Sequence, residues 1–222
     1  MIPFPIILSA PSGAGKTSIA HRLLALRSDV GYSVSCTTRP PRNGARPEVD
    51  GKDYHFLTTE QFLALRERGE FAESAQVHGN LYGTLRSEVE RVLASGRHVV
   101  MDIDVQGAAQ FRRAFPESVT IFILPPSADV LLERLLGRGT EDRAALAARM
   151  IGALEELRSV AEYQYVVVND DIDRAVRQVS AIIDAETARH ERLRDLDHDV
   201  RRLVQQLERE LATSTGTNTG ER

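Results

Sequence analysis

A short loop near the N-terminus combines glycines, a lysine and a hydroxyl residue in an order suited to holding phosphate. The apolar residues 6–8 precede the loop SAPSGAGKT, and SIAHRLLALR after it has the apolar spacing of a helix. In such a loop the backbone N–H groups and the positive end of the helix both attract phosphate oxygens. Lys16 would reach the β- and γ-phosphates of a nucleotide, and the Thr17 hydroxyl would complete a Mg²⁺ shell. This context favours a nucleotide site over a glycine-rich turn with a solvated lysine.

The loop departs at one position from the pattern G-x-x-x-x-G-K-[ST], because Ala10 stands where the first glycine belongs. Gly13 and Gly15 still allow the backbone to approach a phosphate closely. A Mg²⁺ site of this kind also needs an acid at the end of a neighbouring buried strand. The segment HVVMDID supplies Asp102 and Asp104, which lie two residues apart and would face the same side of a strand. We therefore expect both carboxylates to line one crevice.

Composition restricts the classes of protein that this chain can belong to. Its 222 residues suit one compact domain with appendages, and 42% hydrophobic and 27% charged residues exclude collagen-like and wholly disordered chains. No apolar run reaches the length of a membrane span, no secretory signal is visible, and the lone Cys36 cannot form an intrachain disulfide. We therefore expect a cytoplasmic protein without a membrane partner. A net charge of −4 argues against a nucleic-acid coat, so local clusters must hold any anionic ligand.

Strand-like and helix-like segments alternate along most of the chain, which predicts an α/β fold with a parallel sheet covered by helices on both faces. Between Val30 and Gly83 the pattern changes to short strands separated by turns, with one capped helix near TTEQF, and this indicates an inserted lobe. From Arg189 to Leu211 a charged helix with an apolar seam is expected, and residues 213–222 have a disordered composition. Packing of this helix on the domain, or solvation, is favoured over self-association, because the seam is too short for a coiled coil.

Several ordered motifs together resemble the guanylate kinase family over roughly residues 5–186. They are SAPSGAGKTS, SCTTRPPR, GKDYHF, FAESAQVHGNLYG, VVMDIDVQG, IFILPPS, LLGRGT and VVND. The resemblance implies transfer of a phosphoryl group from ATP, with Mg²⁺, to GMP or dGMP. It also implies a P-loop core with a parallel sheet flanked by helices, an inserted mixed α/β GMP-binding lobe and a small helical lid. The expected boundaries are 1–36, 89–134 and 153–188 for the core, 37–88 for the lobe, 135–152 for the lid and 189–222 for the C-terminal helix and tail.

The resemblance assigns the GMP-binding residues. A guanine base offers N1–H and N2–H₂ donors beside an O6 acceptor, and a pocket built on such hydrogen bonds can reject adenine by about 10⁴-fold or more. The residues implied for the base are Ser35, Glu73, Thr84 and Asp104. Arginine forks and tyrosine hydroxyls suit the GMP phosphate. The residues implied for it are Arg39, Arg42, Tyr54 and Tyr82.

The resemblance likewise assigns the ATP site and the groups at the reacting phosphate. Phosphoryl transfer to an ionised phosphate needs alignment and charge neutralisation rather than a strong base. Lys16 together with the lid arginines Arg134, Arg138 and Arg149 is therefore expected to be catalytic. The metal is expected on Thr17 and, through water, on Asp102. The residues implied for ATP binding are Ala10, Pro11, Ser12, Gly13, Ala14, Gly15, Lys16, Thr17, Ser18 and Asn169.

Two other classes of protein share parts of this pattern. A non-catalytic guanylate-kinase-like interaction module would keep the fold but typically loses the loop lysine and lid arginines, which are present here. A kinase for a sugar phosphate would lack the guanine-binding residues. Two departures from the family pattern remain: the stretch from Arg42 to Tyr54 is a few residues longer than usual, and Leu81 stands where an aromatic residue is common.

Overall fold

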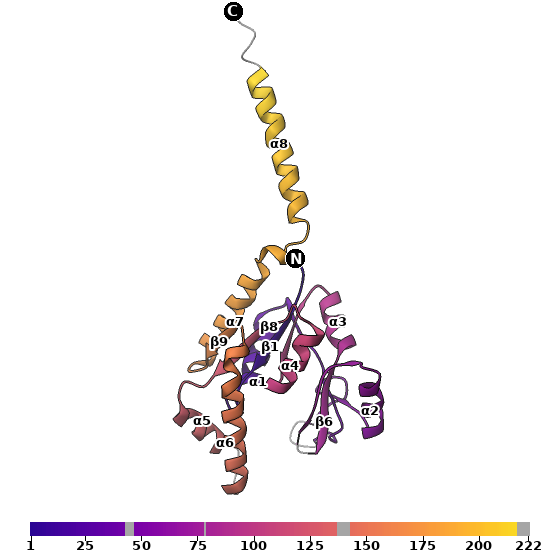
Figure 1. Cartoon of the computed structure of the whole chain (residues 1–222), viewed down its shortest axis with the longest axis vertical. Helices are drawn as coiled ribbons and strands as arrows, with labels where there is room; N and C mark the ends of the chain where they lie inside the picture. The colour runs from indigo at the N-terminus through magenta and orange to yellow at the C-terminus, as the bar shows by residue number, and fades with distance from the viewer. Residues whose placement is uncertain (43–46, 78, 137–142, 217–222) are drawn as a thin grey trace, which may run out of the picture. The chain divides into compact units, whose positions relative to one another are not determined.

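The computed structural model describes residues 1–42, 47–77, 79–136 and 143–216 (Figure 1). Two compact units are present. One comprises Pro3–Ile183, and the other comprises Met1–Ile2 with the chain from Asp184 onward. The sequence-predicted lid residue Arg138 lies outside the described residues.

A five-stranded parallel sheet forms the centre of the larger unit, in the strand order β2-β7-β1-β8-β9. Apolar runs form these strands because both of their faces are buried, as in other parallel sheets. The strands are β1 (Pro5–Ser9), β2 (Val30–Tyr32), β7 (His98–Asp102), β8 (Val119–Leu124) and β9 (Tyr165–Val168). The α/β class and the parallel sheet expected from the sequence are confirmed.

Alternating residues of β1 enter two different hydrophobic cores. Ile6 and Leu8 belong to a cluster shared with α1 (Lys16–Leu26) and α7 (Ile172–Thr187). Ile7 lies in a second cluster with α3 (Arg86–Ala94) and α4 (Val105–Ala114). Burial of large apolar side chains on both sides of the strand, each contributing roughly 1.5–3 kcal/mol, fixes β1 and the loop that follows it.

A separate four-stranded mixed sheet has the order β4-β3-β6-β5. Its strands are β3 (Cys36–Thr37), β4 (His55–Phe56), β5 (Phe71–Val77) and β6 (Asn80–Leu85), and α2 (Thr59–Glu67) belongs to the same segment of the chain. The expected cap of α2 is present, since Thr58 and Gln61 exchange hydrogen bonds as a capping box. Burial raises the pKa of the Cys36 thiol to about 12, which fits a small apolar filler rather than a reactive group.

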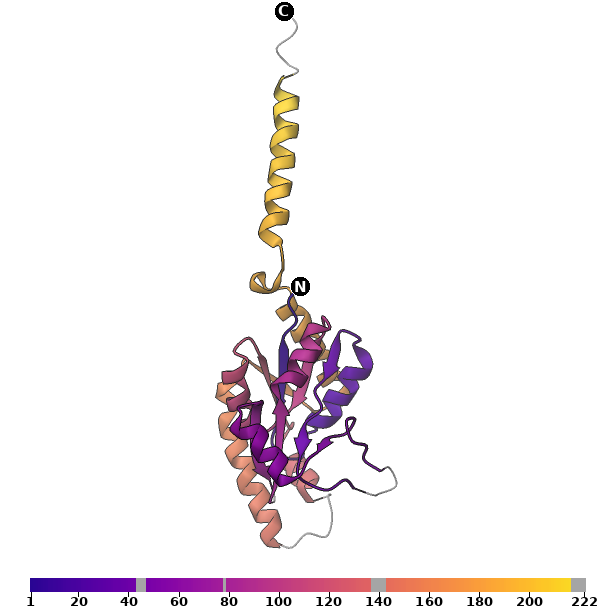
Figure 2. The same cartoon turned by 90° about the vertical axis from the view of Figure 1, so that its right-hand side faces the viewer.

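Two further helices pack against each other through apolar side chains, and the longer of them runs along the lower left edge of the larger unit in Figure 2. They are α5 (Ala128–Leu136) and α6 (Arg143–Arg158), the latter followed by the 3₁₀ turn η1 (Ser159–Glu162). Ser127 caps α5 as expected, because its Oγ accepts the Val130 N–H at 3.2 Å. The pair shares a small apolar core of Leu131, Leu135 and Ala153.

The smaller unit contains the end of α7, the 3₁₀ turn η2 (His190–Arg192) and α8 (Leu196–Gly216). The Ile2 N–H donates to the Arg192 carbonyl at 2.9 Å. Two sequence expectations are wrong here. The helix begins at Leu196 rather than near Arg189, because η2 and the left-handed Asp195 (φ 60°) interrupt it. It also continues to Gly216, into the stretch expected to be disordered.

None of the helices in the described part of the chain is long and apolar enough to cross a membrane.

Candidate active site

The loop between β1 and α1 has the backbone conformation that a phosphate cradle requires. Gly13 and Gly15 adopt φ values of 87° and 93°, which are strained for residues with a side chain. α1 begins at Lys16, so the positive end of its dipole lies at the loop. A pocket of about 280 Å³ is lined by loop residues and by Glu156 of α6; the loop residues are Ala10, Pro11, Ser12, Gly13, Gly15, Lys16, Thr17 and Ser18.

Asn169, at the end of β9, supports this loop from the inside of the protein. It is buried, and its Nδ2 donates to the Ala14 carbonyl at 2.7 Å. Arg134 of α5 donates at 3.5 Å to the carbonyls of Ala14 and Asn169. Asn169, expected at the ATP site, and Arg134, expected among the catalytic lid arginines, therefore meet at the loop, where both donate to its backbone.

The expected acid at the edge of the sheet lies beside the loop. Asp102 ends β7, and its Oδ2 accepts the Thr17 hydroxyl at 2.6 Å. Its Oδ1 accepts the Tyr32 hydroxyl at 3.2 Å, a contact that the sequence analysis missed. Burial, followed by the Asp102 charge, raises the pKa of Tyr32, so the phenol stays a donor. Only the position of Tyr32 at the end of β2, next to β7, could have suggested this partner.

Asp104 does not lie on the same strand as Asp102, contrary to the expectation from the sequence. β7 ends at Asp102, and Asp104 instead caps α4 by accepting the Gly107 N–H on its Oδ1 at 2.7 Å. The two acids therefore do not share one strand face. The chain turns into a helix between them, so Asp102 faces the phosphate loop while Asp104 belongs with the residues expected to contact guanine.

The oxygen ligands near the loop suit Mg²⁺ bound mainly by phosphates. In the described residues no group of three or more His, Cys, Asp and Glu side chains could hold a metal ion unaided. Mg²⁺ in nucleotide sites typically takes one or two protein oxygens, with water and phosphate completing its shell. The Thr17 hydroxyl and the Asp102 carboxylate form such a pair.

The expected guanine pocket, defined by Ser35, Glu73, Thr84 and Asp104, brings together residues of the second sheet and the start of α4. Glu73 of β5 and Thr84 of β6 are paired cross-strand neighbours, and both are buried. The Thr84 hydroxyl donates to Glu73 Oε1 at 2.7 Å, and the Ser35 and Thr84 hydroxyls lie 3.3 Å apart. The four expected residues thus come from β5, β6, the segment before β3 and the start of α4.

The Glu73 carboxyl titrates near neutrality. Burial, with a smaller contribution from the Asp104 charge, raises its pKa to about 7, although the hydrogen bond from Thr84 and the Lys16 charge oppose the rise. Gly107 packs against this carboxyl so closely that a Cβ there would lie 3.1 Å from Glu73 Oε2. Gly107 was not predicted as a site residue, and its only signal in the sequence is a glycine within an otherwise helical segment.

In the expected phosphate clamp, defined by Arg39, Arg42, Tyr54 and Tyr82, the two arginines contact an unexpected carboxylate. Glu48 accepts two hydrogen bonds from the Arg39 guanidinium, at 2.8 and 2.9 Å. It also accepts the Arg42 backbone N–H at 2.8 Å. The hydrogen bond from Arg39 is the largest cause of the lowered pKa of Glu48. Glu48 lies in the stretch that is longer than usual, and nothing in its sequence context marked it as a site residue.

The aromatic members of the clamp stand next to Arg39. Its Cζ lies 5.5 Å from the centre of the Tyr54 ring, and the Tyr54 and Tyr82 ring centres are 6.1 Å apart. Burial raises the pKa of Tyr54, so its hydroxyl remains a hydrogen-bond donor at neutral pH. Arg39, Tyr54 and Tyr82 are therefore brought together as expected.

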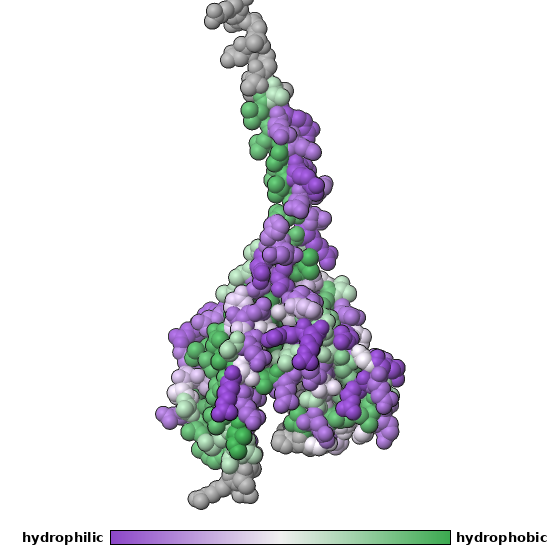
Figure 3. All heavy atoms as spheres, viewed as in Figure 1, coloured by the Kyte–Doolittle hydropathy of each residue, from purple (hydrophilic) through white to green (hydrophobic). Residues whose placement is uncertain are grey.

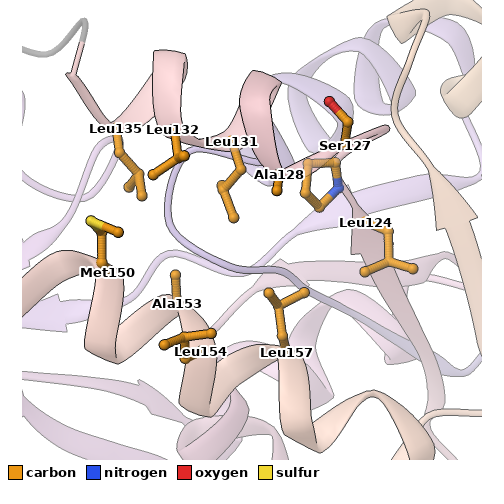
Figure 4. Close-up of a pocket in the computed structure, with 11 residues that line it drawn as sticks. Leu124, Ser127, Ala128, Leu131, Leu132, Leu135, Met150, Ala153, Leu154 and Leu157 are labelled. Carbon is orange, nitrogen blue, oxygen red and sulfur yellow. The ribbon is translucent and has the colours of Figure 1, made fainter.

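Of the three expected lid arginines, two are described. Arg134 reaches the phosphate loop, whereas the Nη1 of Arg149 on α6 donates to the Leu135 carbonyl at 2.8 Å. Between α5 and α6 lies an apolar pocket of about 360 Å³ (Figure 4). Leucines of α5 face Met150, Ala153 and Leu157 of α6 across it, and none of the described residues that line it is charged.

The molecule is hollowed between the α5–α6 side and the side that carries the second sheet (Figure 3). A parallel sheet with a phosphate loop after its first strand, beside a polar pocket on a separate sheet, defines a P-loop nucleotide kinase. The model of the family described as Guanylate kinase matches residues 3–186.

Individual relatives agree with this match. Guanylate kinase from Nitratidesulfovibrio vulgaris is 49% identical over 182 residues, covering 82% of this chain and 86% of the relative. Guanylate kinase from Thermotoga maritima is 48% identical over 189 residues, covering 85% and 90%. The crystal structure of guanylate kinase from Anaplasma phagocytophilum, 36% identical, superimposes with a TM-score of 0.70 and covers 89% of this chain and 93% of that one. The chain belongs to the guanylate kinase family.

Proposed function

We propose that this guanylate kinase transfers the γ-phosphoryl group of Mg²⁺-ATP to GMP and dGMP, giving ADP and the corresponding diphosphate. The observation that carries the residue-level assignment is the position of Lys16 at the start of α1, where it lines the loop pocket together with Thr17. Thr17 in turn donates to Asp102 at the end of β7. The ammonium group and the expected metal ligands therefore belong to one site at the phosphate loop.

The phosphate loop, with Ser18 after it, is proposed to hold the ATP phosphates through backbone N–H groups, supported by the dipole of α1. Thr17 would bind Mg²⁺ directly, and Asp102 would hold it through a water molecule. The metal would supply charge neutralisation on the β- and γ-phosphates. Asn169 stays the proposed neighbour of the adenine base, although its amide N–H₂ already donates to Ala14.

GMP is proposed to place its base against Glu73 and its phosphate in the clamp. An ionised Glu73 accepts the N1–H and N2–H₂ donors, and a hydroxyl of the pocket donates to O6. Adenine would present an acceptor to the carboxylate and a donor to the hydroxyl, leaving buried polar groups unpaired. The GMP phosphate would then compete with Glu48 for the Arg39 guanidinium.

In the transfer step a phosphate oxygen of GMP attacks the γ-phosphorus of ATP. The bond between the γ-phosphorus and the β,γ-bridging oxygen breaks, and ADP leaves. The acceptor oxygen is already ionised, so no general base is needed. Lys16, Arg134 and Arg149 are proposed to neutralise the spreading charge, together with Arg138 outside the described residues. Arginine groups in such positions contribute about 10³–10⁵-fold to turnover in related phosphoryl transfers.

A coupled assay of ADP release tests this proposal, with Mg²⁺-ATP and each of GMP, dGMP, AMP, CMP, UMP and ribose 1,5-bisphosphate as acceptor. Turnover should be confined to GMP and dGMP, and Lys16→Ala should lower it by about 10²-fold or more. Binding of GMP without turnover of any acceptor would instead identify a non-catalytic module.

Self-association through α8 is a second proposal. Five apolar side chains along one side of this helix are exposed (Figure 3): Val200, Leu203, Val204, Leu207 and Leu211. A second copy would cover them helix to helix. Sedimentation of the wild type should show an oligomer that Leu203→Asp with Leu207→Asp converts to a monomer. A monomeric wild type at working concentration would refute the proposal.

The expected division into core, GMP-binding lobe, lid and tail is likewise proposed, with substrate-driven closure of lobe and lid. We also propose a cytoplasmic location, where ATP and GMP are both available.

A further inference from the structure

A carboxylate from a distant part of the chain reaches the phosphate loop. Glu156, near the end of α6, accepts the Ser12 backbone N–H on its Oε2 at 3.0 Å. The side chain is half-buried, and it is the one residue from outside the segment 10–18 that lines the 280 Å³ pocket.

The surroundings of Glu156 are those of an anion site. Burial raises the pKa of its carboxyl and Asp104 adds to the rise, while the Ser12 N–H and the Lys16 charge lower it. The groups that stabilise this carboxylate are therefore an N–H of the phosphate loop and the loop lysine. A phosphoryl oxygen uses the same two kinds of partner, a directed N–H and a nearby cation.

We infer that Glu156 is an intramolecular competitor of the ATP phosphates: its carboxylate occupies the Ser12 N–H in the nucleotide-free chain and must leave when ATP binds. The inference rests on the proposed role of the phosphate loop. A carboxylate and a polyphosphate cannot share the same N–H, and in so small a pocket their charges repel. The free energy of the contact with Ser12 is consequently lost from ATP binding, so Glu156 weakens the affinity of the loop for polyphosphate.

Because Glu156 lies on α6, its displacement by ATP would also remove a contact of α6. Arg149 lies seven residues earlier on the same helix, which is two helical turns. α6 contacts the phosphate loop through Glu156, and it contacts α5 through Arg149 and the shared apolar core. Displacement of Glu156 removes the contact with the loop and leaves the contacts with α5, so ATP binding loosens the attachment to the loop of the helix that carries a proposed catalytic arginine.

The test compares Glu156→Gln with wild type by titration calorimetry. Glutamine keeps the size of the side chain and an acceptor oxygen but removes the charge. The matched control is Glu155→Gln, because Glu155 is the exposed neighbour on the same helix. Three probes are titrated: Mg²⁺ with a non-hydrolysable ATP analogue, Mg²⁺ with inorganic tripolyphosphate, and adenosine. A thermal melt of each variant checks that it folds, and Glu156→Ala serves as a second variant.

Glu156→Gln should bind both polyphosphate probes about tenfold more tightly than wild type, as expected for removal of one nearby like charge. Adenosine affinity should not change, and Glu155→Gln should behave as wild type. The KM for ATP should fall in parallel. Unchanged or weaker polyphosphate binding by Glu156→Gln would overturn the competition, and so would an equal gain for adenosine. If wild type bound no polyphosphate at all, the assignment of the loop itself would be wrong.

Discussion

We expect GMP binding to depend on pH close to neutrality, because Glu73 is buried and is proposed to contact guanine. Burial raises the pKa of its carboxyl to about 7. In the proposed complex guanine presents two N–H donors to this group, so binding requires the ionised form. Below its pKa the protein must release a proton before GMP can bind, and affinity is therefore lost as the pH falls through 7. Above its pKa the carboxylate is already ionised and affinity should level off.

The size of the effect follows from the ionised fraction. With a pKa of about 7, roughly nine-tenths of Glu73 is ionised at pH 8 and roughly one-tenth at pH 6. The Kd for GMP should therefore be about tenfold higher at pH 6 than at pH 8, which corresponds to about 1.4 kcal/mol of binding free energy. A carboxyl with an ordinary pKa near 4.5 would give no such change over this interval.

The assay is calorimetric titration of GMP from pH 5.5 to 8.5, on wild type and on Glu73→Gln. The GMP phosphate also titrates, with a pKa of about 6, but it does so for both proteins. The ratio of the two affinities therefore isolates Glu73. This ratio should change about tenfold between pH 6 and pH 8. A ratio that stays constant with pH would refute the raised pKa, and equal affinities of wild type and Glu73→Gln at pH 8 would refute the contact between Glu73 and guanine.

Two further substitutions test the phosphate loop and the metal site. Gly15→Ala should destabilise the protein by about 1–3 kcal/mol, because its φ is 93° and the added Cβ would overlap the Asn169 amide. Gly96→Ala is the matched control, with φ at 80° but open space around it; equal shifts in Tm for the two variants would contradict the steric argument. Asp102→Asn should raise the Mg²⁺ concentration for half-maximal rate about tenfold or more, since it weakens the partner of Thr17. A Mg²⁺ dependence identical to that of wild type would exclude Asp102 from the metal site.

Much of the fold could be predicted because local patterns and burial agree. The apolar run at β8 and the strand–loop–helix order around Lys16 depend on neighbouring residues alone, and both appear where the sequence placed them. The cap of α2 is similarly local, since Thr58 and Gln61 lie within one helical turn. The guanine pocket was reached only through the family resemblance, because Ser35, Glu73 and Asp104 are far apart in sequence.

The site residues that were not predicted from the sequence owe their roles to contacts between distant segments of the chain. Tyr32 meets Asp102 because β2 and β7 are neighbours in the sheet, an order that no local pattern encodes. Glu48 and Glu156 are ordinary acids in sequence and acquire their roles from the arginine and the N–H group that they meet. Asp104 was misplaced because the end of β7 is set by competition between a strand and a helix cap.

The hydrogen bonds of the guanine pocket also have a direction. Thr84 has a single hydroxyl proton and gives it to Glu73, so towards Ser35 it can only accept. The Ser35 proton therefore points to Thr84 in the free protein, and it must rotate away before it can be donated to a guanine oxygen. When Glu73 is protonated, its carboxyl can donate to Thr84, and Thr84 can then donate to Ser35, so the direction of both hydrogen bonds can reverse. Protonation of the Glu73 carboxyl would then change whether the Ser35 and Thr84 hydroxyls donate or accept hydrogen bonds towards the purine base. Base selection and proton uptake therefore depend on the same hydrogen-bonded chain of hydroxyl and carboxyl groups.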